Sequence, residues 1–520
     1  MSTNNEKSFA NGDPLDSDII KGNYDAELAI IQNFEGKYPK QLWYLFFSEM
    51  WERFCFYGMR GMLTFFMVYR MGMEKEAANL QYGATQAWVY AFTFIGGMFA
   101  DKILGFKKSL FWGGILMITG SVILTINPSA WFFLGISFLI VGTGFFKPNI
   151  SSMVGQLYKD GDNRRDAGFS LFYSGINMGA FLGGILMIGI GKGTILSSVV
   201  PENLRWNVAF ALVAVAMLIS LLIFTFTRNH LGSIGNTPID YDKNPNQKWY
   251  MYAVYIGALA CVPIIVKMVS NTVYTDYFMY FIGPFSLAYL IFEMTKLDRA
   301  ANLKLVAALV FIVFSSLFWA IFEQAGGSLS LYAAEHLDKG TLGADPNMVN
   351  NSANSLFVIV FAPLVGLLWL WANKKKIEPN SVVKFGIGFL MLAAGFYIFG
   401  VNKMFANQGI APQDIFILGW LVITFGEIAL SPIGLSLMTK LATPRLQGFM
   451  MGMWFLASAY GQYIAGLFGA AISPDKNASA IEKLEVYSSG YTQFAMYALI
   501  AGIVIIVISP MVRKLMGDVK

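Results

Sequence analysis

Seven ionisable residues lie inside long apolar stretches of the sequence, where a charge is costly. Placing such a group at the centre of a lipid bilayer costs roughly 2.5–3.5 kcal/mol, so each needs a partner or a function. Three are positive and four are negative, which leaves one carboxylate without a cation to pair with. We expect that carboxylate to take up and release a proton. The seven residues are Glu49, Glu52, Arg53, Arg60, Lys147, Glu323 and Glu427.

Four residues of the first apolar stretch follow helical spacing. Glu49, Arg53, Tyr57 and Arg60 are separated by 4, 4 and 3 positions, so on an α-helix they share one stripe. A salt bridge between Glu49 and Arg53 that merely holds this helix in place would leave Arg60 unexplained. The stripe is therefore predicted to face protein or water in the interior of the molecule.

The remaining buried charges suggest gates at two depths. Lys147 lies about nine residues, roughly 13 Å, from the end of its predicted helix, too far to reach water easily. Counted by helical rise, Arg60 and Glu323 lie near one face of the membrane, while Lys147 and Glu427 lie nearer the other. We predict two ion pairs across a central site, Arg60 with Glu323 and Lys147 with Glu427.

The composition indicates a membrane protein. Of the 520 residues, 56% are hydrophobic and only 13% are charged, about half the charged share of a soluble domain, which is roughly 25%. The two cysteines exclude a disulfide framework, and no basic cluster with interleaved aromatics suggests a nucleic-acid partner. We predict an all-α integral membrane protein whose surroundings are the lipid bilayer.

Fourteen apolar runs are long enough to cross a bilayer, which takes about 20 helical residues. We predict spans at 42–68, 79–101, 109–126, 131–156, 167–189, 206–227, 249–266, 278–295, 305–325, 354–373, 385–402, 414–437, 447–470 and 493–512.

Lysine and arginine residues predict how these spans are oriented, because cytoplasmic loops carry the excess. With a cytosolic amino terminus, 25 of the 37 basic residues fall on the cytosolic side and nine on the other. The first 40 residues lack the apolar core of a cleavable signal. We expect a multi-pass protein of the cell (inner) membrane with both termini in the cytosol.

A polar stretch at 229–248 divides the chain. Six spans precede it, and two spans poor in charge and six further spans follow, an arrangement in which transporters bind substrate between two halves. The predicted organisation is a cytosolic segment 1–41, a six-helix bundle 42–228, a linker with an inserted two-helix hairpin 229–301, a six-helix bundle 302–516 and a tail 517–520.

Several motifs resemble those of the proton-dependent oligopeptide transporter family (POT/PTR), within the major facilitator superfamily. The resemblance covers nearly all of residues 42–512, and the inserted hairpin is similar to one in bacterial members. The matching motifs are ExxERF at 49–54, GFFKPN at 144–149, a form of FYxxIN at 172–177 and GEIALSP at 426–432.

The resemblance implies a role for each candidate residue. The peptide carboxylate would be bound by Arg53, Arg60 and Lys147. The peptide amine would be bound by Asn177, Asn354 and Glu427. Proton coupling would involve Glu49, Glu52, Arg53 and Glu323. The pocket would be lined by Phe56, Tyr57, Tyr90, Trp319, Ser431 and Trp454. Phe56 departs from the family pattern, because many members carry a second tyrosine there.

The implied function is a symporter that imports di- and tripeptides together with protons by alternating access. The proton gradient would drive it, so no cofactor, metal or obligate protein partner is expected. Two alternatives remain: a carrier of another small anion or metabolite, such as nitrate, and a membrane peptide sensor that does not transport. An enzyme is disfavoured, because His230 and His336 are both predicted in loops and the sequence contains no HExxH, GxSxG or Walker A motif.

Overall fold

The computed structural model describes residues 26–159, 161–239, 244–430, 434–443, 445–517 and 519. Over these residues the chain is built from α-helices joined by turns and short 3-10 or π-helical segments, which confirms the all-α prediction. Ser431, one of the predicted pocket residues, lies outside the described residues.

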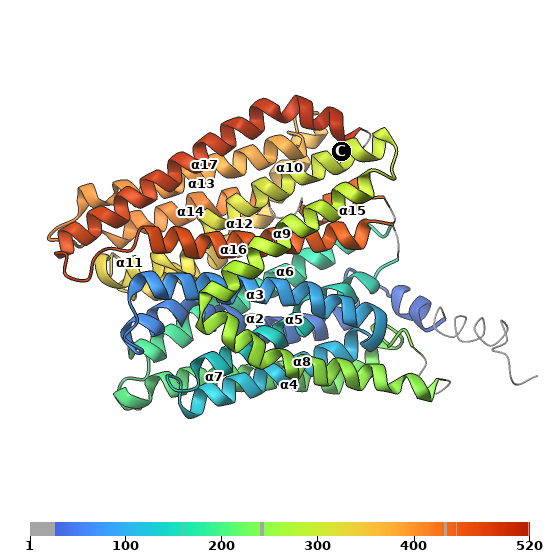
Figure 1. The fold of residues 1–520 in the computed structure, drawn as a ribbon, viewed down its shortest axis with the longest axis horizontal. Coiled ribbons are helices and arrows are strands. Elements are labelled where there is room, and N and C mark those ends of the chain that lie inside the picture. The colour runs from blue at the N-terminus through green and yellow to red at the C-terminus, as the bar shows by residue number, and fades with distance from the viewer. Residues whose placement is uncertain are drawn as a thin grey trace, which may run out of the picture.

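Six helices of the first half pack around one hydrophobic core (Figure 1). The helix with the charged stripe, α2, packs along α6 and α7. The helices are α2 (Lys40–Tyr69), α3 (Lys75–Phe99), α4 (Phe106–Ile126), α5 (Phe132–Gln156), α6 (Arg164–Lys192) and α7 (Arg205–Thr227).

The helices of the second half enclose a second hydrophobic core. In Figure 1 this half, in yellow to red, lies above the first half, in blue to green. Its helices are α10 (Arg299–Phe322), α11 (Ser328–His336), α12 (Pro346–Lys374), α13 (Ser381–Val401), α14 (Gln413–Leu430), α15 (Gly434–Leu441), α16 (Gln447–Ala471) and α17 (Ala480–Met516).

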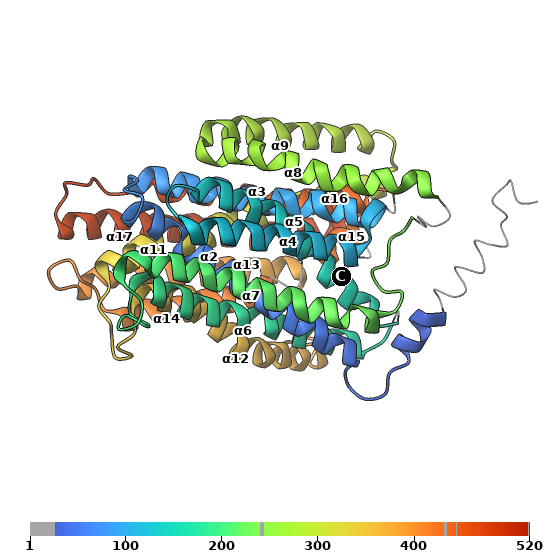
Figure 2. The ribbon, with the colours of Figure 1, turned by 90° about the horizontal axis from the view of Figure 1, so that it is seen from below.

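A hairpin of two helices, α8 (Lys248–Ser270) and α9 (Thr272–Met294), forms a separate layer outside both halves (Figure 2). It contacts each half near the line where α3 meets α16. The indole nitrogen of Trp88 on α3 donates to Thr275 over 3.0 Å, and the hydroxyl of Tyr463 on α16 donates to Asp276 over 2.7 Å. The hairpin thus lies across the contact between the halves.

Twelve of the described helical segments are long and apolar enough to span a membrane. The two other predicted spans, 42–68 and 447–470, correspond to α2 and α16, which have 30 and 25 residues and pack among the rest. Charges on α2, and glycine, glutamine and tyrosine on α16, lower their hydropathy. Both are nevertheless longer than the roughly 20 residues that a crossing requires.

One predicted boundary needs correction, and one span is described only in part. Of the span predicted at 414–437, the structure describes α14 (Gln413–Leu430) and α15 (Gly434–Leu441), and residues 431–433 lie outside the described residues. The span predicted at 305–325 is one part of a longer helical segment, Arg299–His336.

One of the two histidines differs from the prediction that both lie in loops. His336 is the last residue of α11 and is only 1% exposed, and its Nδ1 lies 2.9 Å from the carbonyl oxygen of Gly409. His230 belongs to a 3-10 turn, Arg228–Leu231. A buried histidine at a helix end has the same sequence appearance as one in a surface loop.

The two ends of the molecule are named here by the limits of α2, as the Lys40 end and the Tyr69 end. Near the Tyr69 end, α3 and α16 run antiparallel and approach so closely that their backbones touch. A Cβ added to Gly83 would lie 2.6 Å from the Cα of Gly466, so only glycine allows this approach.

Candidate functional site

The charged stripe of α2 forms a buried cluster of one cation and two carboxylates. The Nε of Arg53 lies 3.1 Å from Oε1 of Glu49 and also pairs with Glu52. All three side chains are at most 3% exposed. Each carboxylate keeps one oxygen without a hydrogen-bond partner among the described residues. The cluster therefore has one negative charge more than its cation can balance, and it can accept a proton.

The predicted pair between Arg60 and Glu323 is formed and joins the two halves. The Arg60 Nε also donates to the hydroxyl of Tyr82 over 2.9 Å. Close by, the hydroxyl of Thr64 donates to the carbonyl oxygen of Gly326 over 2.6 Å. These contacts connect α2 to the 3-10 turn Glu323–Gly326 that follows α10.

Further ion pairs connect the halves at the Tyr69 end. They are Lys75 with Glu335 at 2.5 Å, Lys192 with Asp345 at 2.7 Å and Lys476 with Glu74 at 3.3 Å. Between the described residues, none of the ion pairs near the Lys40 end joins α2–α7 to α10–α17. The Tyr69 end is therefore the end that ionic contacts hold closed.

The predicted pair between Lys147 and Glu427 is not formed. The ammonium of Lys147 lies 4.4 Å from the centre of the Tyr90 ring and 5.5 Å from that of Phe56. In the described part of the chain, no carboxylate lies within 4.0 Å of it. Since the Lys40 end lacks ionic closure between the halves, residues at equal depth on opposite halves need not meet there.

A carboxylate and an amide predicted to act together are in contact. The Nδ2 of Asn354, on α12, donates to Oε2 of Glu427, on α14, over 2.7 Å, and it also lies 3.1 Å from the hydroxyl of Thr424. Tyr173 of α6 interacts with Glu427 from the other half. Asn177, the third predicted residue of this group, donates instead to the carbonyl of Tyr173 in its own helix, over 3.0 Å.

Two further predicted pocket residues lie beside the cations of α2. The ring of Phe56 is centred 5.1 Å from the guanidinium carbon of Arg53, and the ring of Tyr57 is centred 5.6 Å from that of Arg60. Each ring therefore makes a cation–π contact with a guanidinium, in which the negative face of the ring attracts the positive charge.

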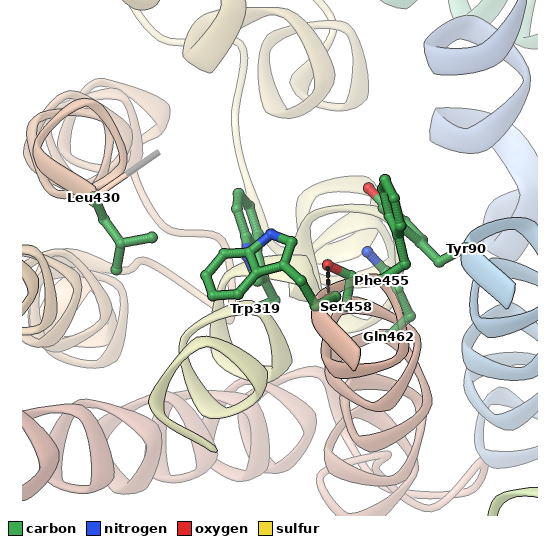
Figure 3. Close-up of a pocket in the computed structure, with 7 residues that line it drawn as sticks. Tyr90, Trp319, Leu430, Phe455, Ser458 and Gln462 are labelled. Atoms are coloured by element: carbon green, nitrogen blue, oxygen red, sulfur yellow. Dashed lines mark hydrogen bonds between the residues drawn. The ribbon is translucent and has the colours of Figure 1, made fainter. Parts of the chain in front are cut away.

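A cavity between the halves is lined by three of the predicted pocket residues, Tyr90, Trp319 and Trp454. Figure 3 shows Tyr90 reaching into this region from α3, opposite side chains from α10 and α16. Four more residues complete the lining and were missed by sequence reasoning: Leu430, Phe455, Ser458 and Gln462.

One sequence signal could have identified two of the missed residues. Trp454, Ser458 and Gln462 follow one another at intervals of four, which places them on one face of α16. Neutral polar residues in an apolar helix usually take part in helix packing, so this spacing by itself does not indicate a binding site.

Two helical halves with a cavity between them define a membrane transporter of the major facilitator type. A model of the POT family matches residues 107–484. Because this match covers more than half of the sequence, the chain belongs to the POT family.

Named relatives extend the similarity over nearly the whole chain. The peptide transporter YePEPT of Yersinia enterocolitica is 33% identical, over 93% of this chain and 96% of the relative. A di-/tripeptide transporter of Lactococcus lactis subsp. cremoris is 30% identical, over 93% and 97%. The crystal structure of peptide transporter POT in complex with sulfate is similar with a TM-score of 0.79 at 29% identity, covering 95% of this chain and 99% of that one.

Proposed function

We propose that this protein is a symporter that imports di- and tripeptides together with protons by alternating access. The relatives' names support a peptide substrate, as does a solved structure of peptide transporter POT in complex with alafosfalin. The observation that carries the proposal is the division of charge between the halves. Buried cations lie on α2 and α5, and the Asn354–Glu427 pair lies on α12 and α14. A zwitterion whose charged ends are 5 Å or more apart suits such a site.

Lys147 is the cation most available to the peptide carboxylate. Arg53 is shared between Glu49 and Glu52, and Arg60 is paired with Glu323. Lys147, by contrast, lies against the ring of Tyr90, which lines the cavity. A carboxylate beside its ammonium would gain a charge-assisted hydrogen bond, and Arg53 and Arg60 would add to the positive potential.

The α2 cluster supplies the proton site of the proposed mechanism. While Glu49 or Glu52 is protonated, Arg53 is balanced by the other carboxylate. When the proton leaves, the excess negative charge binds Arg53 more strongly. Proton uptake and release would thus change how much positive charge Arg53 offers to a peptide. The proton gradient alone would drive transport, with no cofactor or metal.

The closed Tyr69 end supports an orientation. Given the excess of basic residues on the side of the amino terminus, we place the Lys40 end in the cytosol and both termini there, in the inner membrane of a bacterium. In that orientation the ion pairs at the Tyr69 end close the outer side of the protein.

Uptake of labelled dialanine by proteoliposomes under an imposed pH gradient tests the proposal. We expect dialanine to accumulate above its external concentration when the outside is acidic, and accumulation to stop when a protonophore removes the gradient. Labelled nitrate is the control substrate. Accumulation of nitrate without dialanine would replace the proposed function with that of an anion carrier, for which the amine-binding Glu427 would have no use.

Lys147→Ala is expected to reduce dialanine uptake at least tenfold at low substrate concentration. Losing one charge-assisted hydrogen bond costs about 1.5–3 kcal/mol, and a tenfold loss corresponds to about 1.4 kcal/mol. The measurement is the initial rate of uptake at several peptide concentrations. An unchanged rate would mean that Lys147 has a structural role only.

Acetylation of the peptide amine tests the role of Glu427. Acetyl-dialanine should compete with labelled dialanine at least tenfold more weakly than dialanine itself, because it cannot place an ammonium beside the carboxylate. Equal competition by the two peptides would remove Glu427 from the amine site.

A further inference from the structure

Gln462 is a polar residue in the cavity that binding of the peptide termini does not use. Its side chain is 2% exposed and lines the cavity. Its Oε1 has no hydrogen-bond partner among the described residues. Figure 3 shows Gln462 beside Ser458 on the wall formed by α16.

The residues around Gln462 leave the oxygen of its side-chain amide without a hydrogen bond in the described structure. Trp319, Trp454 and Phe455 present mainly apolar surface to the cavity, and the Ser458 hydroxyl donates to the carbonyl oxygen of Trp454 in its own helix. A buried amide without a partner is costly. Because Gln462 borders a cavity, a ligand can supply what the protein does not.

The rest of the lining restricts what that ligand group can be. All seven lining residues are uncharged, and Lys147, which lies against the ring of Tyr90, is assigned to the peptide carboxylate, so a charged side chain among them would have no ion-pair partner of its own. The aromatic walls suit an apolar stem, and the amide of Gln462 suits a neutral hydrogen-bonding group at its tip.

We infer that Gln462 determines side-chain specificity by binding a peptide side chain that is polar but uncharged, an amide or a hydroxyl. Such a side chain would lie between the two tryptophans and exchange hydrogen bonds with Gln462. Peptides with an aliphatic or thioether side chain of the same size would leave the amide unsatisfied and bind more weakly. This inference rests on the proposed function, because it concerns the peptide that the site would carry.

Matched dipeptides test the inference in proteoliposomes that contain the full chain. Alanyl-glutamine and alanyl-methionine have the same backbone and side chains of similar length, and each competes with labelled dialanine. We expect alanyl-glutamine to compete about tenfold better in the wild type, which corresponds to about 1.4 kcal/mol. In Gln462→Met the tenfold preference should disappear, so that the two dipeptides compete equally with labelled dialanine.

Gln86→Met is the control variant. Gln86 lies on α3, one turn from Gly83. Gly83 is close to Gln462, because a Cβ added to Gly83 would lie 3.0 Å from the backbone oxygen of Gln462. It is fully buried, and both polar atoms of its side chain lack partners within the described structure. It is not among the residues that line the cavity, so its replacement should leave the tenfold preference unchanged. Equal loss in both variants would show that helix packing, not contact with the substrate, sets the preference.

The wild type alone can overturn the inference, even if Gln462→Met does not fold. Alanyl-threonine and alanyl-valine differ by a hydroxyl in place of a methyl group. Equal competition within both dipeptide pairs would remove the proposed role of Gln462. If the wild type took up no dialanine, the proposed function would fail. In that case, the affinities of the same dipeptides for the purified protein would be compared, and this comparison would test the role of Gln462 separately from transport.

Discussion

Arg53→Ala is expected to abolish proton-driven accumulation of dialanine, reducing it to the level of empty liposomes. Arg53 is the only cation bonded to Glu49 and Glu52 in the described structure, and all three side chains are almost completely buried. Removing one member of a buried ion pair costs about 3–5 kcal/mol. The two carboxylates left behind would have to take up protons, and a site that stays protonated cannot couple transport to a gradient.

Glu49→Gln and Glu52→Gln should also prevent accumulation, for the complementary reason that each removes a carboxylate able to exchange the proton. The measurement is uptake under a pH gradient, compared with counterflow of dialanine in its absence. Counterflow that persists in at least one variant would show that the protein is folded and that the coupling is lost.

Lys403→Ala provides the control. Lys403 pairs with Glu485 at 2.5 Å, but these side chains are 34% and 57% exposed, and exposed pairs contribute about 0–1 kcal/mol. Lys403→Ala should accumulate dialanine to the same level as the wild type. Full accumulation by Arg53→Ala and both glutamine variants would disprove the proposed coupling cluster.

Glu323→Gln is expected to shift the molecule away from the state that is closed at the Tyr69 end. The Arg60 and Glu323 side chains are 11% and 3% exposed, so neutralising the carboxylate leaves a buried guanidinium whose remaining hydrogen bond, among the described residues, is to the hydroxyl of Tyr82. A buried guanidinium that loses its ion-pair partner destabilises the closed state by about 3 kcal/mol or more. The ratio of closed to open molecules would therefore fall by about 100-fold.

Spin labels on the two halves can measure this shift. Val199 and Met404 are 74% and 76% exposed at the Tyr69 end, and both can be replaced by cysteine once Cys261 is changed to serine. Glu323→Gln should move the distance distribution between the labels to longer values. Glu485→Gln, which breaks the exposed pair with Lys403, should leave it unchanged. An unaltered distribution in Glu323→Gln would mean that Arg60 and Glu323 do not act as a gate.

The sequence predicted the charged part of the site well, because charges in apolar helices are rare and each one is informative. The spacing of Glu49 and Arg53 placed them in contact on one helix face. The rise per residue placed Arg60 and Glu323 at one depth, and they do meet. Depth alone could not predict whether Lys147 and Glu427 meet, since that depends on which end of the molecule is closed.

Neutral residues and helix ends were harder to predict. Gln462 and Ser458 resemble ordinary packing residues until the cavity beside them is known. His336 was assigned to a loop because it lies between the predicted spans 305–325 and 354–373, yet it ends α11 and its ring is buried.

The contact between Gly83 and Gly466 makes α3 a lever with unequal arms. The backbones already touch there, so the halves can turn about this point but cannot move closer. At 1.5 Å per residue, the arm toward the Lys40 end is roughly 24 Å and the arm toward the Tyr69 end roughly 12 Å. A turn of about 10° would therefore move the longer arm by about 4 Å and the shorter by about 2 Å. Two ångströms is enough to separate ion pairs now at contact distance, so the Tyr69 end can open with half the movement that closes the Lys40 end.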